Sequence, residues 1–88
     1  MKLILTETGR SDYDYWAIEN KNVFKKIQTL LKDIERSGNA GIGKPEPLKN
    51  ELSGWWSRRI DEKNRLVYRI VDDSTIEVTQ CKGHYDDK

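Results

Sequence analysis

The segment VFKKIQTLLKDI, residues 23–34, has the clearest helical pattern in the chain. Its apolar side chains recur at the spacing of one helix face; they are Val23, Phe24, Ile27, Leu30, Leu31 and Ile34. Arg36 falls in the expected last turn, and Gly38 suits the position that follows a helix. The segment therefore predicts an amphipathic helix whose apolar face packs against another element.

The residues before this helix predict a strand and a shorter helix. Residues 1–5 alternate as in a strand, and the Thr-Gly-Arg sequence at residues 8–10 breaks the pattern. Ser11 is then the expected N-cap of a helix that ends near Glu19. Residues 20–22 separate the two helices, so the sequence predicts an antiparallel helix pair with a short connection.

The second half of the chain predicts a loop followed by strands. Three glycines and two prolines in residues 38–47 argue against regular secondary structure there. Three strand-like runs follow, at residues 55–60, 66–71 and 75–81. Turns are expected at residues 61–64 and 72–74. The order β-α-α-β-β-β predicts an α+β fold, in which two antiparallel N-terminal helices pack on a mostly antiparallel sheet.

Composition limits the class of protein. The chain has 88 residues, which suits a single domain over residues 1–88, and 35% of them are charged. No apolar run is long enough for a transmembrane helix, and the apolar stretch at residues 1–5 is too short for a signal peptide. The single cysteine, Cys81, excludes an internal disulfide. We therefore expect a soluble, cytoplasmic protein with no membrane partner.

Basic residues are concentrated in the middle of the chain. Residues 44–69 carry seven basic and four acidic residues, whereas residues 70–88 carry two basic and five acidic ones. Arginine suits phosphate, because one guanidinium can donate to two oxygens at once. The net charge of only +1 does not support bulk nucleic-acid binding. A local phosphate site and an ordinary mixed-charge surface are both compatible with this pattern.

Strand alternation predicts which arginines share a face of the sheet. The residues expected to face the helices are Ile60, Leu66, Tyr68 and Ile70. Arg59, Arg65 and Arg69 then lie in a row on the opposite face. Without matching carboxylates, these three cations would repel one another and favour a bound anion. The alternative is a polar sheet face exposed to solvent.

Two apparent motifs, a phosphate loop and a Cys-His metal site, are not supported by the rest of the sequence. The pattern G-x-x-x-x-G-K at residues 38–44 imitates a nucleotide phosphate loop, but it follows a helix, and Pro45 replaces the hydroxyl residue that would hold magnesium. Cys81 and His84 are the only cysteine and histidine, too few for a typical metal site. Cys81 is better explained as a small core residue than as a nucleophile. We expect no metal and no cofactor.

The remaining candidates for acid–base chemistry are Glu46 and two residues near the end of the chain. Pro45 and Pro47 flank Glu46 and push it into an extended conformation. His84 and Tyr85 lie just past the last expected strand. Each of these residues, taken alone, is explained as an ordinary surface or tail residue. Together with the arginines, however, a carboxylate base and an imidazole acid suit phosphodiester chemistry at neutral pH.

Four motifs in order resemble the Txe/YoeB family of bacterial toxins, which belongs to the RelE/ParE superfamily. They are KPEPLK at residues 44–49, LSGWWSRRI at 52–60, RLVY at 65–68 and CKGHY at 81–85. The similarity covers the chain from Met1 to Tyr85. The resemblance implies a RelE-like microbial ribonuclease fold and a ribosome-dependent endoribonuclease, or mRNA interferase, that cuts mRNA in the decoding site and inhibits translation. It also implies a cognate YefM/Axe-type antitoxin, and it leaves open whether the chain forms a homodimer.

The resemblance implies catalytic roles for four residues. Glu46 is the expected general base and His84 the expected general acid. Arg65 would stabilise the phosphate in the transition state, and Tyr85 would help orient the substrate. Gly83 departs from the family pattern, because some members carry a bulkier aromatic residue there.

Two further basic residues, Lys49 and Arg59, match family residues that bind the scissile phosphate. The implied reaction is attack of a ribose 2′-OH on the adjacent phosphorus without a metal. Its products are a 2′,3′-cyclic phosphate, or a 3′-phosphate, and a 5′-OH. Two alternatives are a toxin of the same fold that binds a target other than RNA, and a ribosome- or RNA-binding module without nuclease activity.

Overall fold

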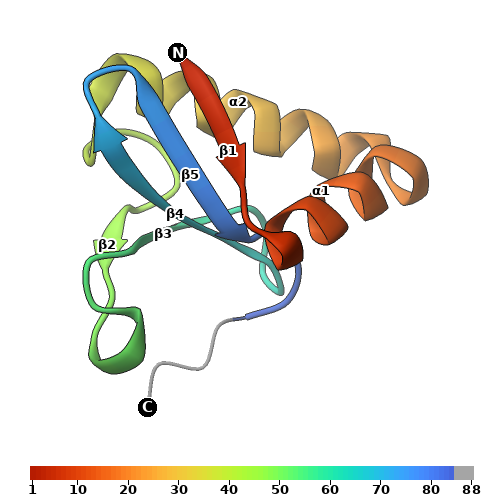
Figure 1. Cartoon of the computed structure of the whole chain (residues 1–88). Helices are drawn as coiled ribbons and strands as arrows, with labels where there is room; N and C mark the ends of the chain where they lie inside the picture. Colours follow the sequence, from red (N-terminus) through yellow and green to blue (C-terminus); the bar gives the residue numbers. More distant parts are fainter. Residues whose placement is uncertain (85–88) are drawn as a thin grey trace.

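A five-stranded sheet with two helices packed on one face forms the framework of the chain (Figure 1). The structure is a computed structural model and describes residues 1–84. Its helices are α1 (Glu7–Glu19), α2 (Lys21–Ser37) and the short 3₁₀ helix η1 (Asn50–Leu52). Its strands are β1 (Lys2–Leu5), β2 (Glu46–Pro47), β3 (Trp56–Arg59), β4 (Arg65–Asp72) and β5 (Thr75–Gln80).

The strands have the spatial order β1-β5-β4-β3-β2, so β1 and β2 are the opposite edges of the sheet. β1 runs parallel to β5, and each other neighbouring pair is antiparallel. The predicted α+β fold, with two helices on a mostly antiparallel sheet, is confirmed. The three predicted C-terminal strands are also confirmed as β3, β4 and β5, with ends within one residue of those expected.

One residue, Asn20, both ends α1 and begins α2. Its backbone N–H donates to the Trp16 carbonyl at 3.1 Å, and its side-chain oxygen accepts from the N–H groups of Asn22 and Val23. This shared cap explains why the connection can be so short. Within the described part of the chain, neither α1 nor α2 has both the length and the apolar character needed to cross a bilayer.

The start of α1 differs from the prediction. The helix begins at Glu7 with Thr6 as its N-cap, whereas Ser11, the predicted cap, lies inside it. The Thr6 hydroxyl oxygen accepts from the Gly9 N–H at 3.1 Å. Gly9 does not break the helix; it is buried where α1 crosses β5, and a Cβ there would collide with the Val78 carbonyl. Close approach of the helix to the strand outweighs the poor helix propensity of glycine.

The two faces of the sheet bury clusters of different size. The face beneath the helices holds the main core, in which Ile60, Leu66 and Tyr68 are buried as predicted and Ile70 is half-buried. This cluster joins the apolar face of α2 to β4 and β5. The opposite face carries only a small cluster formed by Leu48, Val67, Leu52 and Trp55. Most of that second face is therefore left to polar residues.

The loop after α2 is shorter than predicted. Regular structure was not expected in residues 38–47, but Glu46 and Pro47 form β2 and pair with Ser57 and Trp56 of β3. Prolines are tolerated here because β2 is an edge strand, where a missing N–H breaks no central ladder. The extended conformation expected for Glu46 is thus the conformation of a strand.

Candidate active site

β2 and β4 bring Glu46 and Arg65 together across β3. In the sheet register Glu46 lies opposite Ser57, and the Arg65 guanidinium reaches over that serine. Arg65 Nη2 donates to Ser57 Oγ at 2.8 Å and to Glu46 Oε1 at 3.1 Å. The Arg65 side chain is 11% exposed and that of Glu46 is 50% exposed. A cation held by the sheet therefore lies beside a carboxylate that solvent can reach.

A buried arginine on the other face of β3 anchors the loop that leads to Glu46. The Arg58 side chain is fully buried, and its Nη1 donates to Asp33 Oδ2 at 2.6 Å. Its other guanidinium donors reach four more acceptors: the carbonyls of Gly38, Ala40 and Ile42, and the hydroxyl of Tyr68. All five N–H donors of the guanidinium are satisfied, as a buried arginine requires. We refer to Arg58 with these five acceptors as the Arg58 cage.

The Arg58 cage explains why the glycine-rich loop is not a phosphate loop. A phosphate loop points backbone N–H groups at an anion, but here backbone carbonyls converge on a cation. Gly41 has φ +109°, and a Cβ there would collide with the Asp33 carboxylate. The hydrogen bond from Arg58, together with that from the Ile42 N–H, holds the pKa of Asp33 below its usual value. The Gly43 carbonyl then accepts from Arg59 N–H at 2.7 Å, just before β2.

The segment after β5 is tied down at two successive points before it reaches His84. The Cys81 N–H donates to the Asp12 carboxylate at 3.0 Å, and its carbonyl accepts from Trp16 Nε1 at 2.8 Å. These bonds connect the segment to α1. The next tie, at Gly83, joins it to the turn between β3 and β4, which lies alongside (Figure 1).

Gly83 is bonded through both of its backbone groups. Its N–H donates to Asn64 Oδ1 at 2.7 Å, and its carbonyl accepts from the Arg65 N–H at 3.0 Å. His84 follows directly and is exposed. The chain thus carries His84 to the strand end from which Arg65 extends. Tyr85 lies outside the described residues.

The two remaining predicted residues are exposed cations on the same part of the molecule. Arg59 lies directly opposite Arg65 in the β3–β4 register, so their side chains emerge on the same face. Lys49 lies at the beginning of η1, shortly after β2. Among the predicted site residues, Glu46 and Arg65 are in direct side-chain contact. Neither Arg59 nor Lys49 takes part in an ion pair within residues 1–84.

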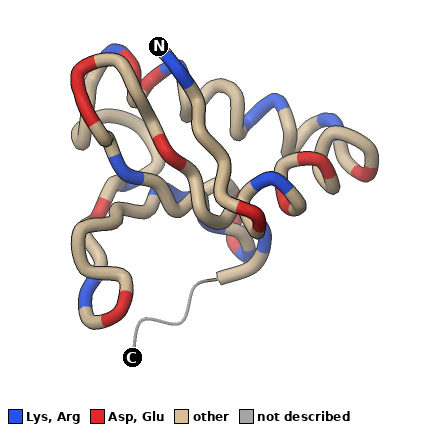
Figure 2. Tube along the Cα trace, in the orientation of Figure 1, with Lys and Arg blue, Asp and Glu red and all other residues tan. Residues whose placement is uncertain are grey.

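The expectation that Arg59, Arg65 and Arg69 lack matching carboxylates is wrong for Arg65 and Arg69. Arg69 Nε lies 2.8 Å from Glu77 Oε1, and its guanidinium stacks over the Trp55 ring at 4.6 Å. Arg65 is paired with Glu46. The neighbouring strand β5 supplies Glu77 directly opposite Arg69 in the register, and β2, on the far side of β3, supplies Glu46. Figure 2 accordingly shows basic and acidic residues interspersed over the sheet and the helices.

Cys81 has the properties of a core residue. It is fully buried, and burial, aided by the nearby charge of Asp12, raises the pKa of its thiol to about 12. A thiol in this environment is a poor nucleophile at neutral pH. In the described residues no group of three or more His, Cys, Asp or Glu side chains is arranged to hold a metal ion.

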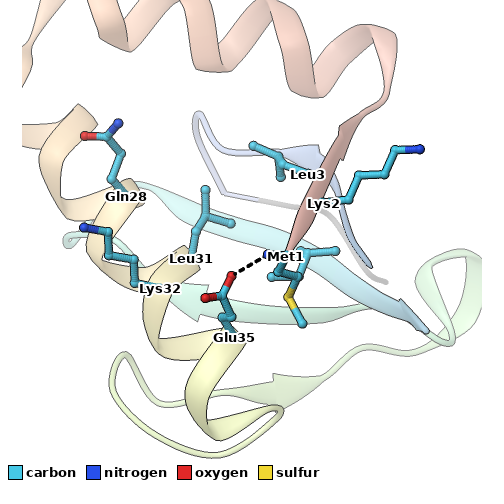
Figure 3. A pocket seen from close by; sticks show the side chains of 8 residues that line it. Met1, Lys2, Leu3, Gln28, Leu31, Lys32 and Glu35 are labelled. Carbon is cyan, nitrogen blue, oxygen red and sulfur yellow. Dashed lines mark ion pairs between the residues drawn. The ribbon is translucent and has the colours of Figure 1, made fainter. Parts of the chain in front are cut away.

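A cavity of about 200 Å³ lies away from these residues, between β1 and α2 (Figure 3). It is lined by Met1, Lys2, Leu3, Gln28, Leu31, Lys32, Glu35 and Ile76. The Met1 ammonium lies 3.1 Å from Glu35 Oε2 at its rim. Because β1 and β2 are opposite edges of the sheet, the Glu46–Arg65 pair is remote from this cavity. At the candidate active site, the Glu46 side chain is half exposed to solvent and that of Arg65 is mostly covered.

Several residues that hold the site in place were not predicted. They are Asp12, Trp16, Asp33, Ser57, Arg58 and Asn64. Most of their contacts join segments far apart in the chain, such as Asp12 and Cys81, which are 69 positions apart. The local signal was limited to Asn64, which was expected in a turn but not as a partner of Gly83.

Comparison with known proteins places the chain in a family. Residues 5–85 match a family described as "YoeB-like toxin of bacterial type II toxin-antitoxin system". Toxin YoeB of Escherichia coli K12 is 52% identical over 85 residues, which cover 97% of this chain and 100% of that protein.

Solved structures agree with this match. YoeB in a YoeB–YefM complex from Staphylococcus aureus has a TM-score of 0.89 and 45% identity, covering 97% of this chain and 98% of that one. YoeB in a dimer from Staphylococcus aureus has a TM-score of 0.88 and 44% identity with the same coverage. The chain belongs to the YoeB family of toxins of bacterial type II toxin–antitoxin systems.

Proposed function

We propose that this chain, acting as one domain over residues 1–88, is a ribosome-dependent endoribonuclease that cuts mRNA and inhibits translation in the cytoplasm. The observation that supports this most is the contact between the Glu46 carboxylate and the Arg65 guanidinium, at 3.1 Å on an open face of the sheet. A proton acceptor and a fixed cation side by side are what attack by a ribose 2′-OH on its own phosphate requires.

The proposed reaction begins when Glu46 accepts the proton of a ribose 2′-OH. The 2′ oxygen attacks the adjacent phosphorus, and the P–O bond to the 5′ oxygen breaks. Arg65, with Lys49 and Arg59, neutralises the charge on the phosphate oxygens, while His84 donates a proton to the departing 5′ oxygen. The products are a 2′,3′-cyclic phosphate, or a 3′-phosphate after hydrolysis, and a 5′-OH. Tyr85, which the family resemblance implicates in orienting the substrate, stays a prediction.

The open site also gives a physical reason for ribosome dependence. The Glu46 side chain is 50% exposed. A flexible RNA strand in free solution would therefore not be held in line with the carboxylate by burial of that residue. Precise alignment of the reacting atoms is a large part of catalysis, so a partner that already holds the mRNA would supply what this surface lacks.

We further propose an antitoxin of the YefM/Axe type as the neutralising partner, since YoeB of Staphylococcus aureus is found in complex with YefM. Exposed Arg59 and Lys49, which lack ion pairs within residues 1–84, suit an acidic antitoxin segment as well as they suit RNA. Self-association is also proposed, because YoeB of the same species is found as a dimer.

The test uses purified ribosomes programmed with a defined mRNA. We expect the wild type to produce 5′-OH ends and the Glu46→Gln variant to cut about 10²–10⁴-fold more slowly. Glu51→Gln is the matched control, because Glu51 is an exposed glutamate of η1 outside the site. A 2′-deoxy nucleotide at the cut position should abolish cleavage. A translation block that is unchanged in Glu46→Gln and leaves no cut ends would show that binding, not cleavage, is the function.

A further inference from the structure

The side chain of Asn64 connects the turn between β3 and β4 to the segment that carries His84. Its amide nitrogen Nδ2 donates to both carboxylate oxygens of Asp61, at 3.1 and 3.0 Å. Its oxygen Oδ1 accepts from the Gly83 N–H at 2.7 Å. Because an ionised carboxylate can only accept, Asp61 fixes which end of the amide faces Gly83.

The turn that presents Asn64 is itself well ordered by hydrogen bonds. Asp61 Oδ1 also accepts from the backbone N–H groups of Lys63 and Asn64, each at 2.8 Å. The Asn64 carbonyl accepts from the Ile60 N–H at 3.0 Å. The exposed turn therefore provides a defined anchor and not a loose loop end.

Gly83 is suited to be the anchored residue. It has φ +79°, a conformation that glycine adopts without strain, and a Cβ there would meet no atom within 4 Å. Glycine is therefore favoured at position 83 by the backbone conformation, and not by a lack of space for a side chain. The bond from the Arg65 N–H to the Gly83 carbonyl, at 3.0 Å, adds a second tie on the opposite side of the residue.

We propose that Asn64 is a positioning residue that, through the Gly83 N–H, fixes the backbone of His84 next to Arg65. This inference rests on the proposed function, because the positioning of His84 matters only if His84 acts as the general acid in RNA cleavage. Asn64 touches neither the phosphate nor the leaving oxygen in this scheme. It keeps the imidazole within reach of the leaving oxygen, where a displacement of about 1 Å can cost about 10²-fold in rate.

The first test compares Asn64→Ala with Lys63→Ala in single-turnover cleavage on ribosomes. Lys63→Ala keeps the backbone N–H of the turn and removes only an exposed side chain. We expect Asn64→Ala to lower the maximal rate by about 10–100-fold with little change in the toxin concentration that gives half the maximal rate. Lys63→Ala should stay within about twofold of wild type, since an exposed side chain outside the site contributes little. A wild-type rate in Asn64→Ala would overturn the inference and leave the proposed function standing.

The second test separates positioning of His84 from general damage to the turn. An mRNA with sulfur in place of the 5′ bridging oxygen has a leaving group that needs no proton. We expect this substitution to restore cleavage by both Asn64→Ala and His84→Ala to near the wild-type rate, but not cleavage by Glu46→Gln. Failure to rescue Asn64→Ala while His84→Ala is rescued would contradict the inference.

A third measurement does not depend on cleavage at all. Hydrogen exchange of the Gly83 amide should be at least about tenfold faster in Asn64→Ala than in Lys63→Ala, with equal thermal stability, because the amide loses its acceptor. If the wild type cuts no RNA but this difference is seen, the proposed function fails and the anchoring of Gly83 stands. Equal exchange in the two variants would overturn the anchoring.

Discussion

Two arginines in neighbouring strands form carboxylate pairs that differ above all in access to solvent. Arg58 of β3 is fully buried beneath the helices and bonds Asp33 at 2.6 Å. Arg65 of β4 lies on the other face and bonds Glu46, a half-exposed carboxylate, at 3.1 Å. The enclosed pair holds the loop before β2 in place, whereas the carboxylate of the open pair is accessible to solvent. Under the proposed function, the same two functional groups serve structure in one place and chemistry in the other.

Sheet register accounts for the difference. In the β3–β4 pair, Arg58 lies opposite Leu66 of the core, while its neighbour Arg59 lies opposite Arg65. Successive residues of a strand face opposite sides, so one position separates the buried cation from the exposed ones. The two regions remain linked, because the loop held by Arg58 continues through Gly43, whose carbonyl is bonded by Arg59, into the strand of Glu46.

The largest effect is expected when the Arg58 cage is broken. We expect Arg58→Ala to lower the free energy of unfolding by about 3–5 kcal/mol, because it leaves a buried carboxylate and several carbonyls without a donor. Arg58→Lys should also be strongly destabilising, since an ammonium cannot reproduce five donors in a planar fork. Urea denaturation followed by circular dichroism measures both.

Arg65→Ala is the matched control for this prediction. Because its partner Glu46 is half exposed, the ion pair contributes about 0–1 kcal/mol, and loss of the hydrogen bond to the buried Ser57 hydroxyl adds about 1–3 kcal/mol. Cleavage should fall by about 10²–10³-fold in this variant, with a loss of stability smaller than that of Arg58→Ala. Equal destabilisation by Arg58→Ala and Arg65→Ala would remove the distinction between the two pairs.

The elements most accessible to sequence reasoning were those with local patterns. The apolar spacing of α2 and the β-branched runs of β4 and β5 depend on residues within one element, so they were predicted within a few residues. Gly9 was misjudged because its role is set by contact with Val78, far along the chain. β2 was missed because Glu46 and Pro47 become a strand only when β3 is alongside.

The site shows the same limit more sharply. The residue types for acid–base chemistry could be named from the sequence, and the sheet brings Glu46 and Arg65, 19 positions apart, into contact. Strand alternation separated Arg59 from the helix-facing side, but it did not show that Arg58 is fully buried with Asp33 as its partner. The partners of Arg69 and of Gly83 were likewise missed, because strand neighbours and side-chain caps supply them.

A smaller effect is expected from crowding the Arg58 cage. We expect Gly41→Ala to lower the free energy of unfolding by about 1–3 kcal/mol, because the new Cβ collides with the Asp33 carboxylate in addition to being strained at φ +109°. Gly54→Ala is the control, since Gly54 has φ +94° but a Cβ there meets nothing within 4 Å. The difference between the two variants measures the collision alone, and equal losses would argue against a tightly closed cage.

The smallest and most specific effect is the pH dependence of the Arg58–Asp33 pair. The hydrogen bond from Arg58, with that from the Ile42 N–H, lowers the pKa of Asp33 in the folded chain. A carboxyl with a lowered folded pKa stabilises the fold above its unfolded value of about 4, and this stabilisation is lost as pH falls through the folded pKa. Wild type should therefore have a larger free energy of unfolding than Asp33→Asn at pH 7, and this difference should narrow below about pH 4.

Urea midpoints of the two proteins between pH 7 and pH 2.5 measure that gap directly. The other carboxyl groups are common to both proteins and cancel in the difference. Asp73→Asn, at an exposed turn position, is the control and should give a smaller difference at pH 7 than Asp33→Asn. If the Asp33→Asn gap instead stays constant down to pH 2.5, the carboxylate charge of Asp33 contributes nothing to the cage, and Arg58 must be held by its carbonyl acceptors alone.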